Sequence, residues 1–195
     1  MTEQRLNLSK SNIMLLQNSG PELDILGQLF VGFAVKSIRK CQSIAEASEA
    51  IRTGAFDLIV VDADMPDNAG FDFIAHLRRA GESANRLAPI LLTCGHTTRG
   101  AIRRAINCGA NFVVAKPITP KIMFDRVIWL ARDEREFVDC EVYAGPDRRR
   151  RSFGPPVGMK GRRSTDLSAA LGAPVGPDMS QSAIDAMFSS KKAVA

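Results

Sequence analysis

Short runs of apolar residues alternate, along the first 137 residues, with longer stretches in which apolar positions recur every three or four residues. A short unbroken apolar run is typical of a strand buried on both faces, and the longer period is typical of an amphipathic helix. The pattern predicts strands at Asn12–Gln17, Ala34–Ile38, Asp57–Val61, Pro89–Thr93 and Phe112–Ala115. It predicts helices at Pro21–Phe30, Ser43–Thr53, Gly70–Ala80, Thr98–Asn107 and Pro120–Phe137.

Five strand–helix units in succession indicate the α/β class. Because each helix returns the chain to the starting end of the sheet, we expect a five-stranded parallel sheet, doubly wound, with helices on both faces. This domain is placed at residues 10–137. In such sheets, ligands and reacting groups gather at the carboxyl ends of the strands.

The composition changes after Phe137. Residues 138–171, which we call the arginine-rich segment, are rich in glycine, proline and arginine and have no apolar period. Such a stretch buries too little apolar surface to offset its ordering entropy, so we expect it to be disordered alone. Residues 172–195 are expected to be a disordered tail in which Ser180–Phe188 forms one or two helical turns.

Positive charge is concentrated in the same region. The chain has a formal net charge of +5, and between Gly145 and Asp166 there are seven basic residues, six of them arginine, against two acidic ones. This concentration predicts an anionic partner for the arginine-rich segment.

Several protein classes are excluded by what the sequence lacks. No apolar run approaches the roughly 20 residues of a membrane span, and the N-terminus has no signal-peptide stretch. Neither a metal-ligand spacing of histidine and cysteine nor a set of nucleophile, base and orienting group is present. We therefore expect a cytoplasmic protein that has no enzymatic activity, metal or membrane partner. The cysteines are scattered without a CxxC pair, which indicates reduced thiols; they are Cys41, Cys94, Cys108 and Cys140.

Polar residues that could take part in chemistry lie at the carboxyl ends of four predicted strands. Gln17 and Asn18 lie at the end of the first strand, Asp62 follows the third, Thr93 ends the fourth and Lys116 follows the fifth. This order resembles the CheY-like receiver family, which has a flavodoxin-like fold. The resemblance implies that Asp62 is the counterpart of a phospho-accepting aspartate. It implies that Thr93 hydrogen-bonds a phosphoryl oxygen and that Lys116 pairs with it.

Two positions depart from the receiver pattern, which covers roughly residues 10–135. Gln17 and Asn18 stand where receivers carry two acidic residues that hold magnesium, a cation that prefers carboxylate oxygens and on which phosphoryl transfer depends. Val113 replaces the usual aromatic residue. We therefore expect no metal, an Asp62 that is not phosphorylated in normal use, and a direct ion pair between Asp62 and Lys116.

The arginine-rich segment carries side chains suited to guanine. Arginine binds phosphate and the O6/N7 edge of guanine in a bidentate way and stacks on bases, and aspartate accepts hydrogen bonds from guanine N–H groups. Asp147 precedes one arginine pair and Asp166 follows another, a duplication that suits a ligand with twofold symmetry. Tyr143 is a candidate stacking partner for a base. The candidate ligand-binding residues are Tyr143, Gly145, Pro146, Asp147, Arg148, Arg149, Arg150, Arg151, Arg162, Arg163 and Asp166.

Residues 163–166 also have the RxxD form that binds cyclic di-GMP at the inhibitory sites of diguanylate cyclases. An arginine-rich segment after a degenerate receiver resembles the CheY-like cyclic di-GMP effectors, the Cle class. The resemblance implies capture of the dinucleotide as a stacked dimer. It also implies that the receiver engages the flagellar motor switch protein, at the flagellated pole, to control motility and surface attachment.

Two other functions remain open at this point. The chain is alternatively a single-domain response regulator that acts through phosphorylation of Asp62. A basic segment also binds nucleic acid, but Asp147 and Asp166 repel a phosphate backbone, so no nucleic-acid partner is expected.

Overall fold

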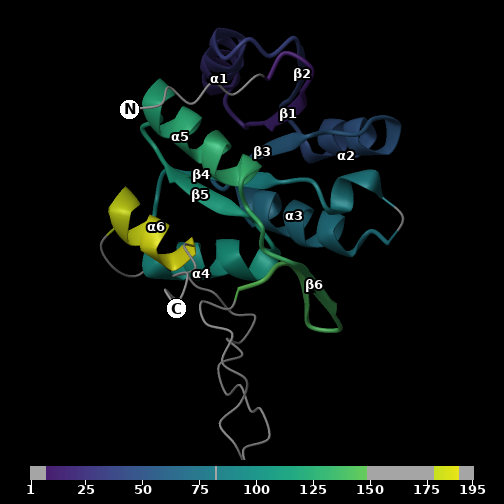
Figure 1. The fold of residues 1–195 in the computed structure, drawn as a ribbon, viewed down its shortest axis with the longest axis vertical. Helices are drawn as coiled ribbons and strands as arrows, with labels where there is room; N and C mark the ends of the chain where they lie inside the picture. The colour runs from purple at the N-terminus through teal and green to yellow at the C-terminus, as the bar shows by residue number, and fades with distance from the viewer. Residues whose placement is uncertain (1–7, 82, 149–177, 189–195) are drawn as a thin grey trace, which may run out of the picture.

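Five parallel strands form one sheet in the order β2-β1-β3-β4-β5 (Figure 1). The computed structural model describes residues 8–81, 83–148 and 178–188. The strands are β1 (Asn12–Leu16), β2 (Ser37–Cys41), β3 (Leu58–Asp62), β4 (Ile90–Cys94) and β5 (Phe112–Ala115). The helices are α1 (Gly20–Gly32), α2 (Ile44–Thr53), α3 (Ala69–Arg79), α4 (Arg99–Cys108), α5 (Pro120–Ala131) and α6 (Gln181–Phe188), with short 3-10 turns at Pro66–Asn68 and Ala84–Arg86. The predicted five-stranded parallel sheet is confirmed.

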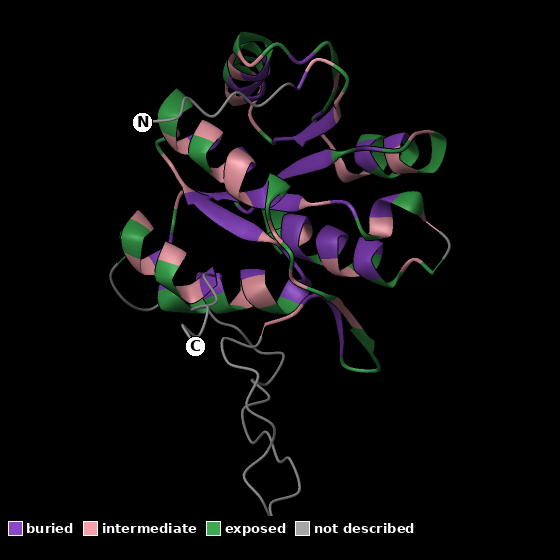
Figure 2. Ribbon diagram, in the orientation of Figure 1, coloured by how far each residue is buried: buried purple, intermediate pink, exposed green. Residues whose placement is uncertain are grey.

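Helices cover both faces of this sheet. Phe33, at the end of α1, packs on Phe124 of α5 with 5.3 Å between ring centroids, so these two helices share one face. Helices α2, α3 and α4 contact one another in that order on the other face. The central strands lie between these layers and are buried along nearly their whole length (Figure 2).

Hydroxyl side chains fix where four of the helices begin. Ser19, Ser43, Thr98 and Thr119 each have extended backbone and accept a hydrogen bond from a backbone N–H in the first turn. Such caps satisfy donors that the helix itself leaves unpaired. In α2, for example, the Ser43 side chain accepts from the N–H of Glu46, three residues on.

The second strand was predicted too early. Strand β2 begins at Ser37, whereas the apolar run predicted Ala34–Ile38. Ala34 has φ of +64° and its N–H donates to Val31, and the N–H of Val35 donates to Phe30. These residues therefore close the C-terminal end of α1 before the strand starts.

The fifth helix is shorter than predicted. It ends at Ala131, not at Phe137, because Asp133 accepts a hydrogen bond from the backbone N–H of Arg135 at 3.2 Å. This aspartate turn competes with the helical hydrogen bonds. The guanidinium of Arg135 also binds Asp133 and the backbone oxygen of Asn111, which holds the chain after α5 against the start of β5.

An antiparallel hairpin, β6 (Phe137–Cys140) and β7 (Tyr143–Pro146), follows this turn. The domain boundary predicted after Phe137 therefore falls inside a strand, and the expectation that structure ends there is wrong. The hairpin packs on Arg78, which is 1% exposed and lies 5.7 Å from the Phe137 ring centroid. Arg78 remains paired, because it donates to Gly109, Ala88 and Asn111 oxygens at 2.9, 2.8 and 2.7 Å.

The helix predicted at Ser180–Phe188 is confirmed as α6, which lies against β5 (Figure 1). Ile184 and Phe188 are buried there. Within residues 8–81, 83–148 and 178–188, no helix is both long enough and apolar enough to cross a bilayer.

Candidate functional site

The carboxyl ends of β3, β4 and β5 bring the predicted pocket residues together. Asp62 and Thr93 are register partners across β3 and β4. Gly70 permits the close approach of α3, because a Cβ on this residue would lie 2.1 Å from the backbone oxygen of Asp62. Lys116, directly after β5, completes the group, so the sequence-predicted convergence of Asp62, Thr93 and Lys116 is confirmed.

Lys116 is the centre of charge in this pocket. Its Nζ lies 2.9 Å from Asp62 Oδ1, which confirms the predicted ion pair. It also lies 2.7 Å from Glu22 Oε2 and 3.3 Å from Asp64 Oδ2. Three carboxylates therefore surround one ammonium. Glu22 was not predicted from the sequence, although its position in the first turn after the Ser19 cap places it near the end of β1.

Burial and neighbouring charges shift the pKa values of Asp62 and Lys116 in opposite directions. Burial raises the pKa of Asp62 above its ordinary value, against the hydrogen bonds from Lys116 and the Asp64 N–H. Burial alone would lower the pKa of Lys116, but the hydrogen bonds to Glu22 and Asp62 and the charge of Asp64 raise it. Lys116 is therefore held in its charged form over the physiological pH range.

Gln17 occupies the innermost position of the pocket. It is fully buried, and its Nε2 donates to Thr93 Oγ1 at 3.1 Å. Its Oε1 has no hydrogen-bond partner among the described residues. Asn18 is exposed. A neutral amide that is committed to Thr93 is a poor substitute for a carboxylate pair, and these residues do not fit the magnesium ion that receivers hold.

Asp64 lies at the exposed rim of the pocket. Its Oδ2 accepts a hydrogen bond from the N–H of Gly95 at 2.8 Å, in addition to its contact with Lys116. The loop after β4 is thereby tied to the loop after β3. The ammonium of Lys116 is thus engaged within the pocket, where carboxylates outnumber it three to one.

Only the beginning of the predicted ligand-binding set lies within the described residues. Arg148 donates from Nη1 to Asn107 Oδ1 at 2.6 Å, and its guanidinium carbon lies 3.8 Å from the Tyr143 ring centroid. The backbone N–H of Asp147 donates to Glu136. The remaining predicted residues lie outside the described part of the chain; they are Arg149, Arg150, Arg151, Arg162, Arg163 and Asp166.

Three predicted ligand-binding residues are structural. Tyr143 is 4% exposed, its hydroxyl donates to the backbone oxygen of Pro146 at 2.7 Å, and Arg148 covers its ring. Gly145 is packed so closely that a Cβ would lie 2.6 Å from the Tyr143 hydroxyl. These three residues are buried in this structure, and the ligand contacts assigned to them, base stacking by Tyr143 included, stay predictions.

The chain on both sides of residues 149–177 is held on α4. Arg148 bonds Asn107 near the end of this helix. Met179 bonds Thr97 just before its start, through Met179 N–H to Thr97 O and Thr97 Oγ1 to Met179 O, both at 2.8 Å. The exposed face of α4 carries Arg99 and Arg103, and the helix contains no acidic residue.

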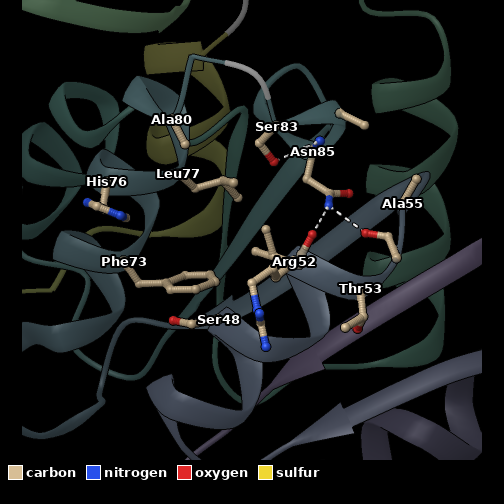
Figure 3. A pocket seen from close by; sticks show the side chains of 13 residues that line it. Ser48, Arg52, Thr53, Ala55, Phe73, His76, Leu77, Ala80, Ser83 and Asn85 are labelled. Atoms are coloured by element: carbon tan, nitrogen blue, oxygen red, sulfur yellow. Dashed lines mark hydrogen bonds between the residues drawn. The ribbon is translucent and has the colours of Figure 1, made fainter.

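A cavity of about 560 Å³ lies between α2 and α3, away from this cluster (Figure 3). Its most polar buried group is Asn85, whose Oδ1 accepts from the Phe56 N–H while Nδ2 donates to Ile51 and Gly54 oxygens. Since these bonds use the whole amide, Asn85 holds the 3-10 turn in place and leaves no group to bind a ligand.

Curated relatives match parts of the chain. The sensory/regulatory protein RpfC of Xanthomonas campestris pv. campestris is 30% identical over 88 residues, which are 45% of this chain and 12% of RpfC. The chemotaxis protein CheY of Pseudomonas aeruginosa is 31% identical over 77 residues, which are 40% of this chain and 60% of CheY. The matches therefore span less than two thirds of either relative's length.

Solved structures share the fold. The chemotaxis protein CheY4 of Vibrio cholerae has a TM-score of 0.57 at 18% identity, covering 62% of this chain and 98% of CheY4. A response regulator from Chloroflexus aurantiacus has a TM-score of 0.58 at 20% identity, and the match covers 63% of this chain and 98% of that chain. The response regulator receiver domain family matches residues 13–128, more than half of the chain. With the strand order and the Asp62–Thr93–Lys116 pocket, this match establishes that the chain belongs to the response regulator receiver domain family.

Proposed function

We propose that this chain is a cyclic di-GMP effector. The arginine-rich segment binds the dinucleotide, as a stacked dimer, and the receiver passes the signal to a protein partner without any enzymatic step or metal ion. One observation carries the proposal: a segment with two arginine–aspartate sets, Asp147 with Arg148-Arg149 and Arg162-Arg163 with Asp166, is anchored at both flanks on α4.

The chemistry of the segment favours a guanine dinucleotide over a general polyanion. Arginine meets both phosphate and the guanine O6/N7 edge, and aspartate accepts from guanine N1–H and N2–H, which a phosphate backbone does not offer. Two such sets match the two guanines of a symmetric ligand. The negative charge of Asp147 and Asp166 lowers affinity for ordinary nucleic acid.

The contacts that hold both flanks of residues 149–177 near α4 support a ligand site beside this helix. At 1.5 Å per residue, α4 rises about 12 Å from its first residue, Arg99, to Asn107, so the contacts at Thr97 and Asn107 lie near opposite ends of the helix. The exposed arginines Arg99 and Arg103 lie between them, one turn apart. A dianionic ligand bound by the arginine-rich segment would lie next to these cations, which increase the local positive potential.

The state of the receiver pocket supports an input other than phosphorylation. Lys116 is already paired with three carboxylates, and Gln17 stands where a magnesium-binding acid is needed. Lys116 is therefore already engaged by carboxylates and is not free to pair with a phosphoryl group.

Calorimetry on the full-length protein tests the proposal. Cyclic di-GMP is titrated into wild type and into the double variant Arg163→Ala/Asp166→Ala. Charge-assisted hydrogen bonds contribute about 1.5–3 kcal/mol each, so losing two of them weakens binding about a hundredfold or more. The matched control is Glu49→Ala/Arg52→Ala, which removes an exposed ion pair on α2. Like the test variant, it removes one acidic and one basic residue, so the net charge is unchanged in both.

The control variant is expected to bind like wild type. Equal affinity of wild type and Arg163→Ala/Asp166→Ala would show that these residues do not read the ligand. Generic RNA in place of cyclic di-GMP, with affinity falling steeply as salt is raised, would favour a nucleic-acid binder instead.

The proposed protein partner is the flagellar motor switch, with the chain acting at the flagellated pole on motility and surface attachment. The similarity to proteins named as chemotaxis proteins supports this choice. A pull-down with purified motor switch protein is expected to be stronger with cyclic di-GMP present. Identical recovery of the motor switch protein with and without the dinucleotide would show that cyclic di-GMP does not control this interaction.

A second candidate is phosphorylation at Asp62, favoured by the convergence of Asp62, Thr93 and Lys116. Incubation with a small phosphodonor and magnesium, followed by mass spectrometry, tests it. The cyclic di-GMP proposal expects no mass shift in wild type. A phosphoryl adduct that disappears in Asp62→Asn would establish the second candidate.

A further inference from the structure

Arg148 lies over the ring of Tyr143 at the end of the hairpin. Its guanidinium carbon is 3.8 Å from the ring centroid, and its Nη1 donates to Asn107 Oδ1 at 2.6 Å. Asn107 is exposed near the end of α4, and Arg148 is half-buried. A planar group that stacks on one aromatic face and donates an N–H to one amide oxygen therefore occupies a site at the surface of the domain.

The fold holds both parts of this site in place. Tyr143 is 4% exposed, and its hydroxyl donates to a backbone oxygen of the hairpin at 2.7 Å. A Cβ on Gly145 would lie 2.6 Å from the Tyr143 hydroxyl and 2.7 Å from the Cα of Gly109, so the hairpin packs tightly against the end of α4. Asn107 belongs to α4 itself. Because the ring and the amide are fixed by the fold, a ligand that replaces the present occupant has little ordering cost to overcome.

Guanine offers the same groups as the guanidinium that fills this site. Its N1, C2, N2 and N3 atoms form a planar guanidine unit, and its N2 amino group is a hydrogen-bond donor. Bases stack on aromatic side chains through their flat faces. A guanine over Tyr143 donates from N2 to Asn107 Oδ1, as Nη1 of Arg148 does in the nucleotide-free protein.

The charge around the site favours a neutral base over a second cation. Arg103 lies four residues before Asn107 on the exposed face of α4, and this helix contains no acidic residue. A cationic side chain from another protein would add charge of the same sign. A dinucleotide instead brings phosphates, to which Arg103 and the displaced Arg148 form charge-assisted hydrogen bonds.

We infer that Tyr143 and Asn107 form a guanine-binding site that Arg148 fills in the nucleotide-free protein, and that a guanine of cyclic di-GMP takes the place of Arg148. The exchange keeps the stacking and the amide hydrogen bond, and it gains a contact between Arg148 and a phosphate. The inference rests on the proposed function for the identity of the ligand. It adds Asn107, a residue of the receiver itself, to those that recognise the dinucleotide.

NMR spectroscopy on the full-length protein saturated with cyclic di-GMP tests this exchange. Tyr143 is the only tyrosine of the chain, so its ring signals are assigned directly. We expect a nuclear Overhauser contact between its ring protons and a guanine H8, and a change in the Nε–H signal of Arg148. If calorimetry shows saturable binding while both sets of signals stay unchanged, the inference is wrong and the proposed function stands. Absence of any binding would refute both.

The inosine analogue cyclic di-IMP, whose bases lack only the N2 amino group of guanine, isolates the contribution of Asn107. The ratio of the affinities for the two dinucleotides is measured by calorimetry in wild type, in Asn107→Ala and in Gln28→Ala, a matched control that removes an exposed amide on α1. Arg148 loses its own bond to Asn107 equally with either ligand, so that loss cancels in the ratio.

The preference for cyclic di-GMP over the inosine analogue is expected to fall about fivefold in Asn107→Ala, the equivalent of one hydrogen bond. Gln28→Ala is expected to keep the wild-type preference. The same preference in all three proteins would show that Asn107 does not contact the base, and would overturn the inference.

Discussion

At the scale of single residues, the pocket at the strand ends is defined by how Lys116 is neutralised. Its ammonium contacts carboxylates of Glu22, Asp62 and Asp64, two of them within 3 Å. The loss of acidic residues at positions 17 and 18 does not leave Lys116 unbalanced, because Glu22 supplies charge from α1. Lys116 is thus held by carboxylates from both α1 and the strand ends.

Restoring the acids at the end of β1 is expected to restore phosphorylation. The variant Gln17→Asp/Asn18→Asp returns carboxylate ligands for magnesium beside Asp62. Incubated with a small phosphodonor and magnesium, it is expected to gain the mass of one phosphoryl group, while wild type remains unmodified. The gain must disappear when magnesium is chelated or when Asp62→Asn is added; modification that survives both would contradict this explanation of the pocket.

Tyr143, the only tyrosine of the chain, reports directly on the hairpin. Burial raises its pKa to about 12. Free tyrosine titrates near 10, so the folded state holds the phenol proton more tightly. Burial of the neutral phenol therefore contributes stability that is fully present below about pH 10, and this contribution is lost as the pH rises from about 10 to about 12.

Absorbance at the phenolate band and urea unfolding check this prediction. The phenol is expected to titrate near pH 12, and Tyr143→Phe is expected to lower the free energy of unfolding at pH 7 by about 1 kcal/mol. The difference between the two proteins should shrink above pH 10. A midpoint near 10 in the folded protein would mean that the ring is accessible, as base stacking requires.

At the scale of elements, the sheet was predictable because its signals are local. Apolar runs such as Leu58–Val61 and the caps at Ser43 and Thr98 specify strands and helix starts within a few residues. The prediction failed where side chains far away in the sequence determine the end of an element or the formation of a new one. The end of α5 depends on a turn at Asp133, and the hairpin depends on the buried Arg78, which no periodicity reveals.

The candidate site was predictable to the same extent. Asp62, Thr93 and Lys116 follow from the strand ends, whereas the contact of Glu22 with Lys116 depends on the tilt of α1 against the sheet. Tyr143 was assigned to a ligand because an aromatic ring within the arginine-rich segment can stack on a base. Its burial follows from the hairpin register, in which it pairs with Cys140.

Helix α4 is expected to contribute to dinucleotide binding through its exposed face. Arg103→Ala removes one cation between the contacts at Thr97 and Asn107, and we expect cyclic di-GMP affinity to fall about tenfold in calorimetry, the equivalent of one charge-assisted hydrogen bond. Lys121→Ala, an exposed cation on α5, is the control. Wild-type affinity in Arg103→Ala would place the ligand away from α4 and would leave the assignment of Arg163 and Asp166 unaffected.

At the scale of the whole molecule, the two flanks of residues 149–177 are held near the two ends of α4. Arg148 bonds Asn107 close to the end of this helix, and Met179 bonds Thr97 just before its start. In the proposed function the arginine-rich segment receives the signal and the receiver passes it to a partner.

The most direct test of the central claim is a calorimetric titration of cyclic di-GMP into full-length wild type and Asp62→Asn. If the dinucleotide is the input and the pocket is not, both proteins give saturable heat with the same affinity and stoichiometry. The account is contradicted if neither protein gives saturable heat at about millimolar dinucleotide, a concentration that detects binding as weak as roughly 4 kcal/mol. It is equally contradicted if Asp62→Asn abolishes binding.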